Sequence, residues 1–224
     1  MQREDLTPIL KNLIILSSLP LSSVEETFSA DASGFSTSRF ARYFDFKYKR
    51  ESKYRIWLKA HLMCGTKTNI ITGVEITEGK ANDSPQLASL VEQTAKNFNL
   101  KEVSCDRAYS SGSNLELIKE AGATPYIPFK SNASGKHSNI TWKKMYHYFL
   151  YKHEEFLEHY HKRSNSESCW NMIKTKFKDN LRSKGKVAQV NELLLKILCH
   201  NLCVVIQEIN ELNLKAEFLV EKEG

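Results

Sequence analysis

The sequence predicts an α/β fold with a mixed five-stranded sheet, in the chain order β-β-β-α-β-α-β, flanked by helices and followed by a helical C-terminal part. Three consecutive β-type segments come first, and a glycine-containing turn at residues 65–67 joins the last two as a hairpin. Segments with helical spacing then alternate with short apolar segments. A meander followed by this alternation indicates a mixed sheet with helices on its faces.

The first half of the chain contains the three strands of the meander. Residues 1–23 read as a short helix closed by Ser-Ser-Leu-Pro and a turn. The stretch TFSADA, residues 27–32, is the first expected strand. Residues 53–64 alternate polar and apolar side chains, and residues 69–79 are rich in β-branched side chains, so both are expected to be strands.

The second half begins with two helix–strand pairs. Residues 84–98 have a serine at the start, a proline in the first turn and apolar residues at helical spacing. Residues 101–106 form a short buried strand that ends in an aspartate. Residues 113–122 form a helix that ends in glycine, and residues 124–129 form the fifth strand. A polar loop at 131–139 leads into the helical remainder.

Composition favours a polyanionic partner in a reducing compartment. The 224 residues include 32 Lys and Arg against 26 Asp and Glu, a formal charge of +6, so nucleic acid is the first candidate. Five cysteines without a CxxC pair argue against a disulfide framework or a common zinc site, and a cytosol fits best. The apolar runs are interrupted by polar residues, so no membrane segment is expected.

Two segments concentrate the positive charge. Residues 39–59 and residues 160–186 each contain eight Lys or Arg and two acidic residues. Such runs are commonly solvated faces, but two of them flanking one site favour a DNA channel.

Two aspartates follow strands that would be neighbours in such a sheet. Asp31 lies at the end of the first strand and Asp106 at the end of the fourth. Polar groups at strand ends face the crevice where ligands bind in open α/β sheets. Two carboxylates brought together repel each other, and a divalent cation between them is the common solution.

A third carboxylate stands alone in the basic segment YHKRSNSESCWNMIK. If residues 160–178 form one helix, Tyr160, Arg163, Glu167, Lys174 and Lys178 share a face about 60° wide. The apolar stripe that would pack on the sheet lies elsewhere on this helix, at Cys169, Trp170, Ile173 and Phe177. The alternative for Glu167 is a plain i,i+4 ion pair with Arg163.

These segments together resemble the DDE transposases of prokaryotic insertion sequences. FSADASGF surrounds Asp31 and VSCDRAYSS surrounds Asp106. The spacing of Tyr160, Arg163, Glu167 and Lys174 resembles the Y-R-E-K signature of one large branch of that family. The resemblance covers about residues 24–210.

The resemblance implies a ribonuclease H-like catalytic domain. Asp31, Asp106 and Glu167 would be catalytic and would bind two Mg²⁺ or Mn²⁺ ions. Tyr160, Arg163 and Lys174 would contact DNA, and Lys178 shares their face. It also implies metal-dependent cleavage of transposon ends and strand transfer into target DNA, in a cut-and-paste reaction. A homodimer would act in the synaptic complex, and the protein would be cytoplasmic and nucleoid-associated.

The expected organisation has three parts: an N-terminal linker or helix at 1–23, which would be a remnant of a DNA-binding region; the catalytic domain at 24–210; and a C-terminal tail at 211–224. Full-length relatives carry a DNA-binding region ahead of the first aspartate. The alternative function is therefore a truncated remnant that binds DNA or the full-length transposase without transposing by itself.

The histidines near the glutamate invite a zinc interpretation. An HExxH motif starting at His153 would need a histidine at 157, where Leu157 stands. His147, His153, His159 and His161 are therefore expected to lie on helix surfaces.

Overall fold

The protein, described by a computed structural model at residues 1–37, 57–213 and 218, contains one five-stranded sheet. The strand order is β3-β2-β1-β4-β5; β1 pairs antiparallel with β2 and parallel with β4. The predicted α/β class with a mixed five-stranded sheet is confirmed. The strands are β1 (Thr27–Ser36), β2 (Trp57–Gly65), β3 (Ile71–Glu78), β4 (Glu102–Cys105) and β5 (Thr124–Tyr126).

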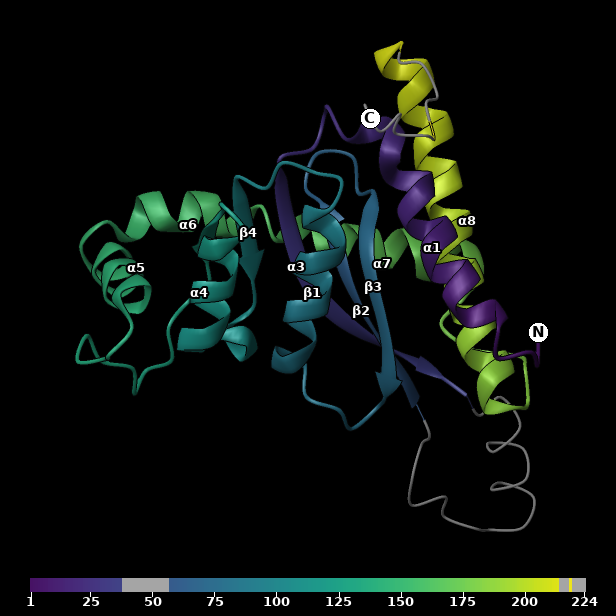
Figure 1. Cartoon of the computed structure of the whole chain (residues 1–224), viewed down its shortest axis with the longest axis horizontal. Coiled ribbons are helices and arrows are strands. Elements are labelled where there is room, and N and C mark those ends of the chain that lie inside the picture. Colours follow the sequence, from purple (N-terminus) through teal and green to yellow (C-terminus); the bar gives the residue numbers. More distant parts are fainter. Residues whose placement is uncertain (38–56, 214–217, 219–224) are drawn as a thin grey trace, which may run out of the picture.

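The helices surround this sheet: α4, α5 and α6 lie at one end of the molecule, α3 and α7 lie beside the strands, and α1 and α8 lie at the other end (Figure 1). The α-helices are α1 (Leu6–Ser18), α3 (Leu87–Ala95), α4 (Gly112–Glu120), α5 (Ile140–Tyr151), α6 (His153–His161), α7 (Ser164–Phe177) and α8 (Lys186–Leu212). Short 3-10 helices are η1 (Leu19–Leu21), η2 (Ser84–Gln86) and η3 (Arg107–Tyr109). None of the helices in the described ranges is long and apolar enough to cross a membrane.

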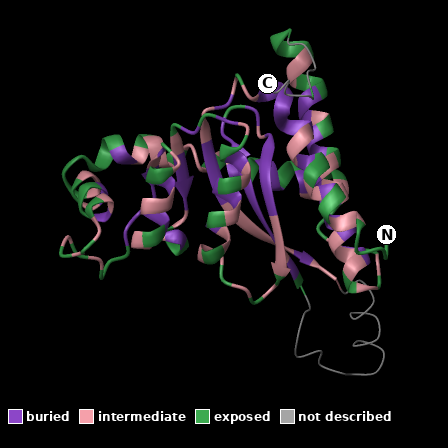
Figure 2. Cartoon of the chain, in the orientation of Figure 1, coloured by how far each residue is buried: buried purple, intermediate pink, exposed green. Residues whose placement is uncertain are grey.

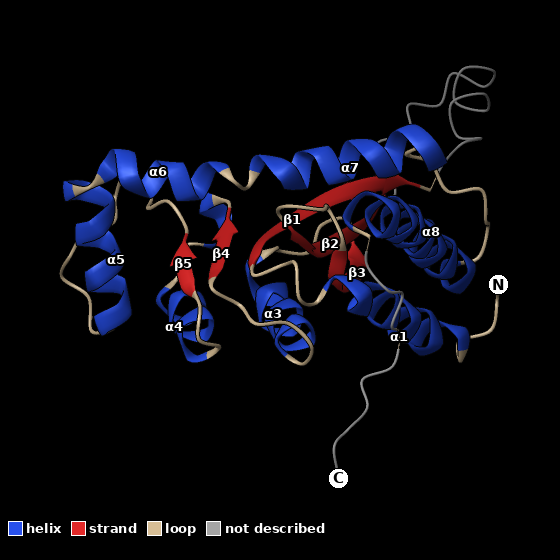
Figure 3. Ribbon diagram, turned by 90° about the horizontal axis from the view of Figure 1, so that it is seen from above, coloured by secondary structure: helices blue, strands red, loops and turns tan. Residues whose placement is uncertain are grey.

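Two hydrophobic clusters pack against the sheet. In Figure 3, α6 and α7 run along one face of the sheet, whereas α3 and α4 lie on the other. One cluster joins Phe28 and Ala30 of β1 to the helices α3 and α4 and continues to α5 and α6. The other joins Phe35 to α1, α7 and α8. The buried strands between them form the centre of the molecule (Figure 2).

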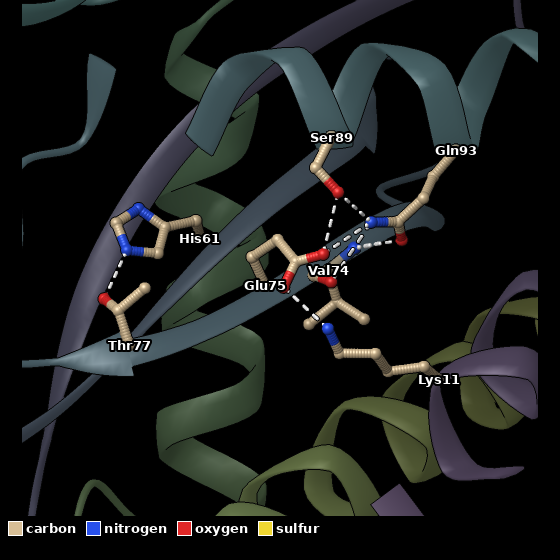
Figure 4. A network of polar contacts seen from close by, with 7 residues as sticks. All are labelled: Lys11, His61, Val74, Glu75, Thr77, Ser89 and Gln93. Carbon is tan, nitrogen blue, oxygen red and sulfur yellow. Dashed lines mark hydrogen bonds and ion pairs between the residues drawn. The ribbon is translucent and has the colours of Figure 1, made fainter. Parts of the chain in front are cut away.

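The N-terminal helix α1 packs on this core. Its Leu10 and Ile14 are buried in the same cluster as residues of α7 and α8. In Figure 4, Glu75 of β3 connects α1 with α3: it accepts hydrogen bonds from Lys11 Nζ (2.6 Å) and from Ser89 Oγ (2.8 Å). The Glu75 side chain is only 20% exposed, and a carboxylate largely removed from water needs such partners, so this shared contact helps to hold both helices on the strand.

The closing helix α8 connects α1 with the sheet through buried amides. Asn201 donates to the carbonyls of Ile14 and Ile71 and accepts from the N–H of Ile71. Asn191 accepts from Thr7 Oγ1 at 2.7 Å. Both asparagines are fully buried, so these bonds satisfy groups that no water reaches.

Candidate active site

The carboxylate of Asp31 lies on the face of β1 that α7 covers. Side chains alternate between the two faces along a strand. Phe28 and Ala30 pack in the cluster with α3, whereas Phe35 contacts Trp170 of α7, with ring centroids 6.0 Å apart. Asp31 is four residues before Phe35, an even number, so its side chain points to the same face of the strand as Phe35 and therefore toward α7.

Asp106 follows the strand next to β1. The parallel register pairs Ala30 with Cys105, so Asp31 and Asp106 each come directly after a paired residue. The side chain of Asp106 caps η3 by accepting a hydrogen bond from the N–H of Ala108. The sheet therefore brings both aspartates to one position, as the strand order predicted.

Glu167 lies in the first turn of α7, but the helix is not the continuous one that the wheel assumed. The α-helical hydrogen bonding is interrupted between α6, which ends at His161, and α7, which begins at Ser164. Lys162 and Arg163 keep right-handed helical dihedral angles there, but the N–H of Arg163 bonds three residues back, to the carbonyl of Tyr160. Figure 3 shows the interruption between two nearly aligned helices. The residues that share one predicted face are thus divided among α6, the junction, α7 and the loop after it.

Tyr160, Arg163 and Glu167 remain neighbours across this junction. The guanidinium carbon of Arg163 lies 6.0 Å from the centroid of the Tyr160 ring, and Arg163 Nη2 lies 3.3 Å from Glu167 Oε1. The Arg163 side chain is 17% exposed, and its buried Nε has no hydrogen-bond partner within the described part of the protein. The i,i+4 ion pair is present, but it leaves part of the guanidinium unsatisfied.

Electrostatics connect the three carboxylates. Burial raises the pKa of Asp31; the N–H of Ala32 and the charge of Arg163 oppose the shift, and the charges of Asp106 and Glu167 add to it. A raised carboxyl pKa means that the negative form is disfavoured where it stands. Asp31 would therefore gain from a cation closer than Arg163.

The donor chemistry fits a hard divalent cation. Mg²⁺ and Mn²⁺ prefer carboxylate oxygens, and three carboxylates approach here from β1, the end of β4 and α7. Within residues 1–37 and 57–213, however, no three His, Cys, Asp or Glu side chains are close enough to hold a metal ion as they stand. Glu167, 67% exposed, is turned to Arg163 instead.

Lys174 of α7 is held against β1, two positions along the strand from Asp31, by a residue that the sequence interpretation missed. Its ammonium donates to Ser33 Oγ at 2.6 Å and lies 5.5 Å from the centroid of the Phe35 ring. Ser33 lies two residues after Asp31 on β1, so both side chains point to the same face, and the alternation of side chains along a strand was the signal that would have identified Ser33. Lys178 is different: it is exposed and directly follows α7, where its φ of +69° departs from the helical geometry that the wheel assumed.

A polar anchor holds the residues before the junction against β4. Glu102 accepts hydrogen bonds from His159 Nδ1 (2.9 Å) and Lys162 Nζ (2.8 Å), and the His159 ring stacks on Tyr126 at 4.5 Å. The expectation that His159 is a helix-surface residue is therefore wrong. Its partners lie 57 and 33 positions away in sequence, where helical spacing gives no signal.

This anchor makes a pH-dependent contribution to stability. Burial raises the pKa of Glu102, but the hydrogen bonds from Lys162 and His159 outweigh it, so the pKa is lowered. A lowered carboxyl pKa stabilises the fold above the unfolded-state value, about 4.3, and this contribution is lost as pH falls through the folded-state value. Glu102→Gln is expected to reduce the free energy of unfolding at neutral pH by about 1–3 kcal/mol. Urea unfolding should show the difference shrinking below about pH 4, and a constant difference would contradict this origin.

The first basic segment is only partly described, because residues 38–56 lie outside the described residues. The contribution of residues 39–56 to a DNA channel therefore stays a prediction. In the second segment, Lys186 pairs with Glu78 at 2.6 Å.

Comparison with known proteins gives a family. The model of the transposase DDE domain matches residues 22–202, most of the chain. No curated protein matches the chain significantly. The match spans all five strands and both aspartates and Glu167, and the sheet agrees with the ribonuclease H-like fold expected from the resemblance. The chain belongs to the transposase DDE domain family.

Proposed function

We propose that this protein catalyses metal-dependent cleavage of DNA at transposon ends and joins those ends to target DNA, as a cut-and-paste transposase. The observation that carries the proposal is the position of Asp31, which lies within β1 rather than at its end and directly follows the pair Ala30–Cys105, next to Asp106 after β4. The charges of Asp106 and Glu167 both act on Asp31 and help to raise its pKa. Membership of the family implies a DNA substrate and transposase chemistry. The function would require a pair of DNA ends, and two copies of the chain are the simplest way to hold them.

Asp31, Asp106 and Glu167 are the proposed ligands of two Mg²⁺ or Mn²⁺ ions. Bound there, the ions would activate a water or 3′-hydroxyl nucleophile and stabilise the leaving oxygen. Glu167 would have to turn from Arg163 toward Asp31. In this exchange of partners, Glu167 gains a metal ion, and the guanidinium of Arg163 becomes free to bind a DNA phosphate through two parallel hydrogen bonds.

Arg163 and Lys174 are the proposed phosphate ligands. Arg163 contacts Tyr160 on one side and Glu167 on the other, and Lys174 lies about two helical turns from Glu167 on α7. A DNA strand along this part of α7 would meet both cations beside the carboxylates. Tyr160 and Lys178 are proposed to add contacts at the two ends of that path.

The proposal is tested by strand transfer of a pre-cleaved transposon end in Mn²⁺. The wild-type protein is expected to join the end to a plasmid, and no product should form with EDTA. Glu167→Gln keeps the side-chain shape and removes the ligand charge, so product should fall by at least about a thousandfold, as for loss of an essential catalytic group. Joining by Glu167→Gln at the wild-type rate would overturn the assignment.

Ser33 should matter through Lys174 alone. Ser33→Ala removes the acceptor that fixes the ammonium, so duplex affinity is expected to weaken by about threefold to tenfold, which corresponds to one hydrogen bond of ordinary net strength, about 0.5–1.5 kcal/mol. Ser33→Thr keeps the hydroxyl and should bind like the wild type. Fluorescence anisotropy with labelled end DNA measures both, and equal losses in the two variants would point to strand packing instead.

A further inference from the structure

The part of the chain between the second aspartate and the glutamate contains an unusually one-sided distribution of charge. No Asp or Glu occurs between Glu120 and Glu154, whereas five lysines do. All five are exposed: Lys130, Lys136, Lys143, Lys144 and Lys152. Lys152 pairs with Glu155 of α6 at 3.0 Å, so the unmixed positive region is residues 130–151, which we call the basic lobe.

The exposed side chains of α5 fall on one side of the helix. At about 100° per residue, Ile140, Lys143, Lys144, His147, Leu150 and Tyr151 occupy an arc of about 120°. The ring of Tyr151, which is 81% exposed, stacks on His147 with centroids 5.7 Å apart and planes 10° from parallel. This face therefore offers two ammonium groups, an imidazole and a phenol side by side.

The opposite side of α5 is packed on an aromatic core. Trp142 and Met145 are buried, and the Phe129 ring contacts the rings of Trp142 at 4.8 Å and Tyr146 at 5.3 Å. Asn139 caps the helix by accepting from the N–H of Trp142. The basic face is thus presented by a rigid element, which lowers the entropy cost of binding.

The loop before α5 is held against the same helix. Trp142 Nε1 donates to the carbonyl of Ser134 at 2.9 Å, and Tyr146 hydroxyl donates to the carbonyl of Ala133 at 3.2 Å. At Gly135 an added Cβ would lie 3.5 Å from the His147 ring. Lys136 therefore belongs to the lobe in space as well as in sequence.

We infer that the basic lobe is a second DNA-binding surface, which holds the phosphate backbone of the duplex that leads away from the cleavage site. The inference rests on the proposed function, since it assumes that DNA occupies the site at Glu167. Glu116 of α4 accepts a hydrogen bond from Asn139 at the start of α5, but residues 130–151 themselves contain no acidic residue. Exposed lysines of such a segment bind phosphate by charge and displace counterions, and tyrosine and histidine add hydrogen bonds to phosphate oxygens. A solvated lysine face elsewhere on this chain is interspersed with glutamates, as on α3, where Lys96 pairs with Glu92.

The position of the lobe fits a continuous duplex. Helix α6 separates α5 from the junction that contains Arg163, and its 9 residues span roughly 14 Å. This corresponds to about four base pairs of B-DNA. Figure 1 shows α5 at the end of the molecule away from α1 and α8, so a duplex along α6 would reach it. The anchor at Glu102 would fix the direction of α6 between the two contacts.

The experiment compares two double variants by anisotropy with a labelled duplex across a salt series. Lys143→Gln/Lys144→Gln is expected to weaken binding on the order of tenfold and to reduce the slope of log K against log salt by about 2, one for each phosphate that no longer meets an ammonium group. Lys96→Gln/Lys119→Gln removes the same charge from the C-terminal end of α3 and from α4, on the other face of the sheet from α6 and α7 (Figure 3), and should keep the wild-type slope. Circular dichroism checks that both fold.

The possible results separate this inference from the proposed function. Equal slopes for the two double variants would overturn the basic lobe as a DNA surface, while metal-dependent joining by the wild type would still support the transposase. Normal joining at saturating DNA by Lys143→Gln/Lys144→Gln, together with its weaker binding, would support both. A wild-type protein that binds no duplex at all would overturn the inference together with the proposed function.

Discussion

Asp31→Asn is expected to abolish strand transfer and, in the same protein, to raise the thermal stability of the metal-free fold. The first effect should be at least about a thousandfold, because one of the three proposed metal ligands loses its charge while its shape is kept. The second follows from the environment of Asp31, where burial raises the carboxyl pKa and Asp106 and Glu167 add repulsion. The neutral amide removes that repulsion.

The difference in stability between Asp31→Asn and the wild type is expected to depend on pH. A carboxyl pKa raised in the folded state makes the wild type lose stability as pH rises from the unfolded-state value, about 3.9, through the folded-state value. Asp31→Asn should therefore melt above the wild type at neutral pH, and the advantage should vanish below about pH 4. Differential scanning calorimetry in EDTA measures it. Asp5→Asn is the matched control, since Asp5 is exposed and pairs with Arg3. A metal-free wild type that melts above Asp31→Asn at neutral pH would contradict the electrostatic account.

Ile14→Ala is expected to have the largest effect on stability. Ile14 is 0% exposed, and α1 fills a cluster shared with α7 and α8. Truncating a fully buried isoleucine removes apolar contacts and leaves a cavity, which costs about 2–5 kcal/mol. Guanidinium unfolding with an unchanged m-value would measure the loss.

The matched control for this prediction lies on the same helix. Ile9 is 50% exposed, so Ile9→Ala should change the free energy of unfolding by no more than about 0.5 kcal/mol. If the two variants were equally stable, α1 would not be part of the core that supports α7. The boundary at residue 23 would then separate α1 from the catalytic domain, in line with the expected N-terminal linker or helix at 1–23.

Sequence periodicity was sufficient for the sheet, because each strand has its own local signal. The alternation of residues 57–64 and the β-branched run of 71–77 lie within β2 and β3, and the aspartates follow from the strand order. β1 is longer than the predicted 27–32: it continues through Gly34 to Ser36, because residues 33–36 pair with β2. That pairing depends on residues distant in sequence, which no local pattern reveals.

The site was harder to predict than the sheet, because the helical wheel assumes one uninterrupted helix. The junction at Lys162 and Arg163 divides α6 from α7, and Lys178 falls beyond the end of α7. The contacts that hold this junction come from Glu102 on β4, whose partners lie 57 and 60 positions away.

The central claim is that Asp31, Asp106 and Glu167 form one metal site, and direct counting of bound Mn²⁺ tests it. Electron paramagnetic resonance of free Mn²⁺ in a titration of the full chain reports the number of ions bound. The account predicts two ions for the wild type, as a two-metal mechanism requires. It also predicts the loss of binding in Asp31→Asn and in Glu167→Gln, with normal binding by Asp5→Asn. Wild-type Mn²⁺ binding by either active-site variant would contradict it.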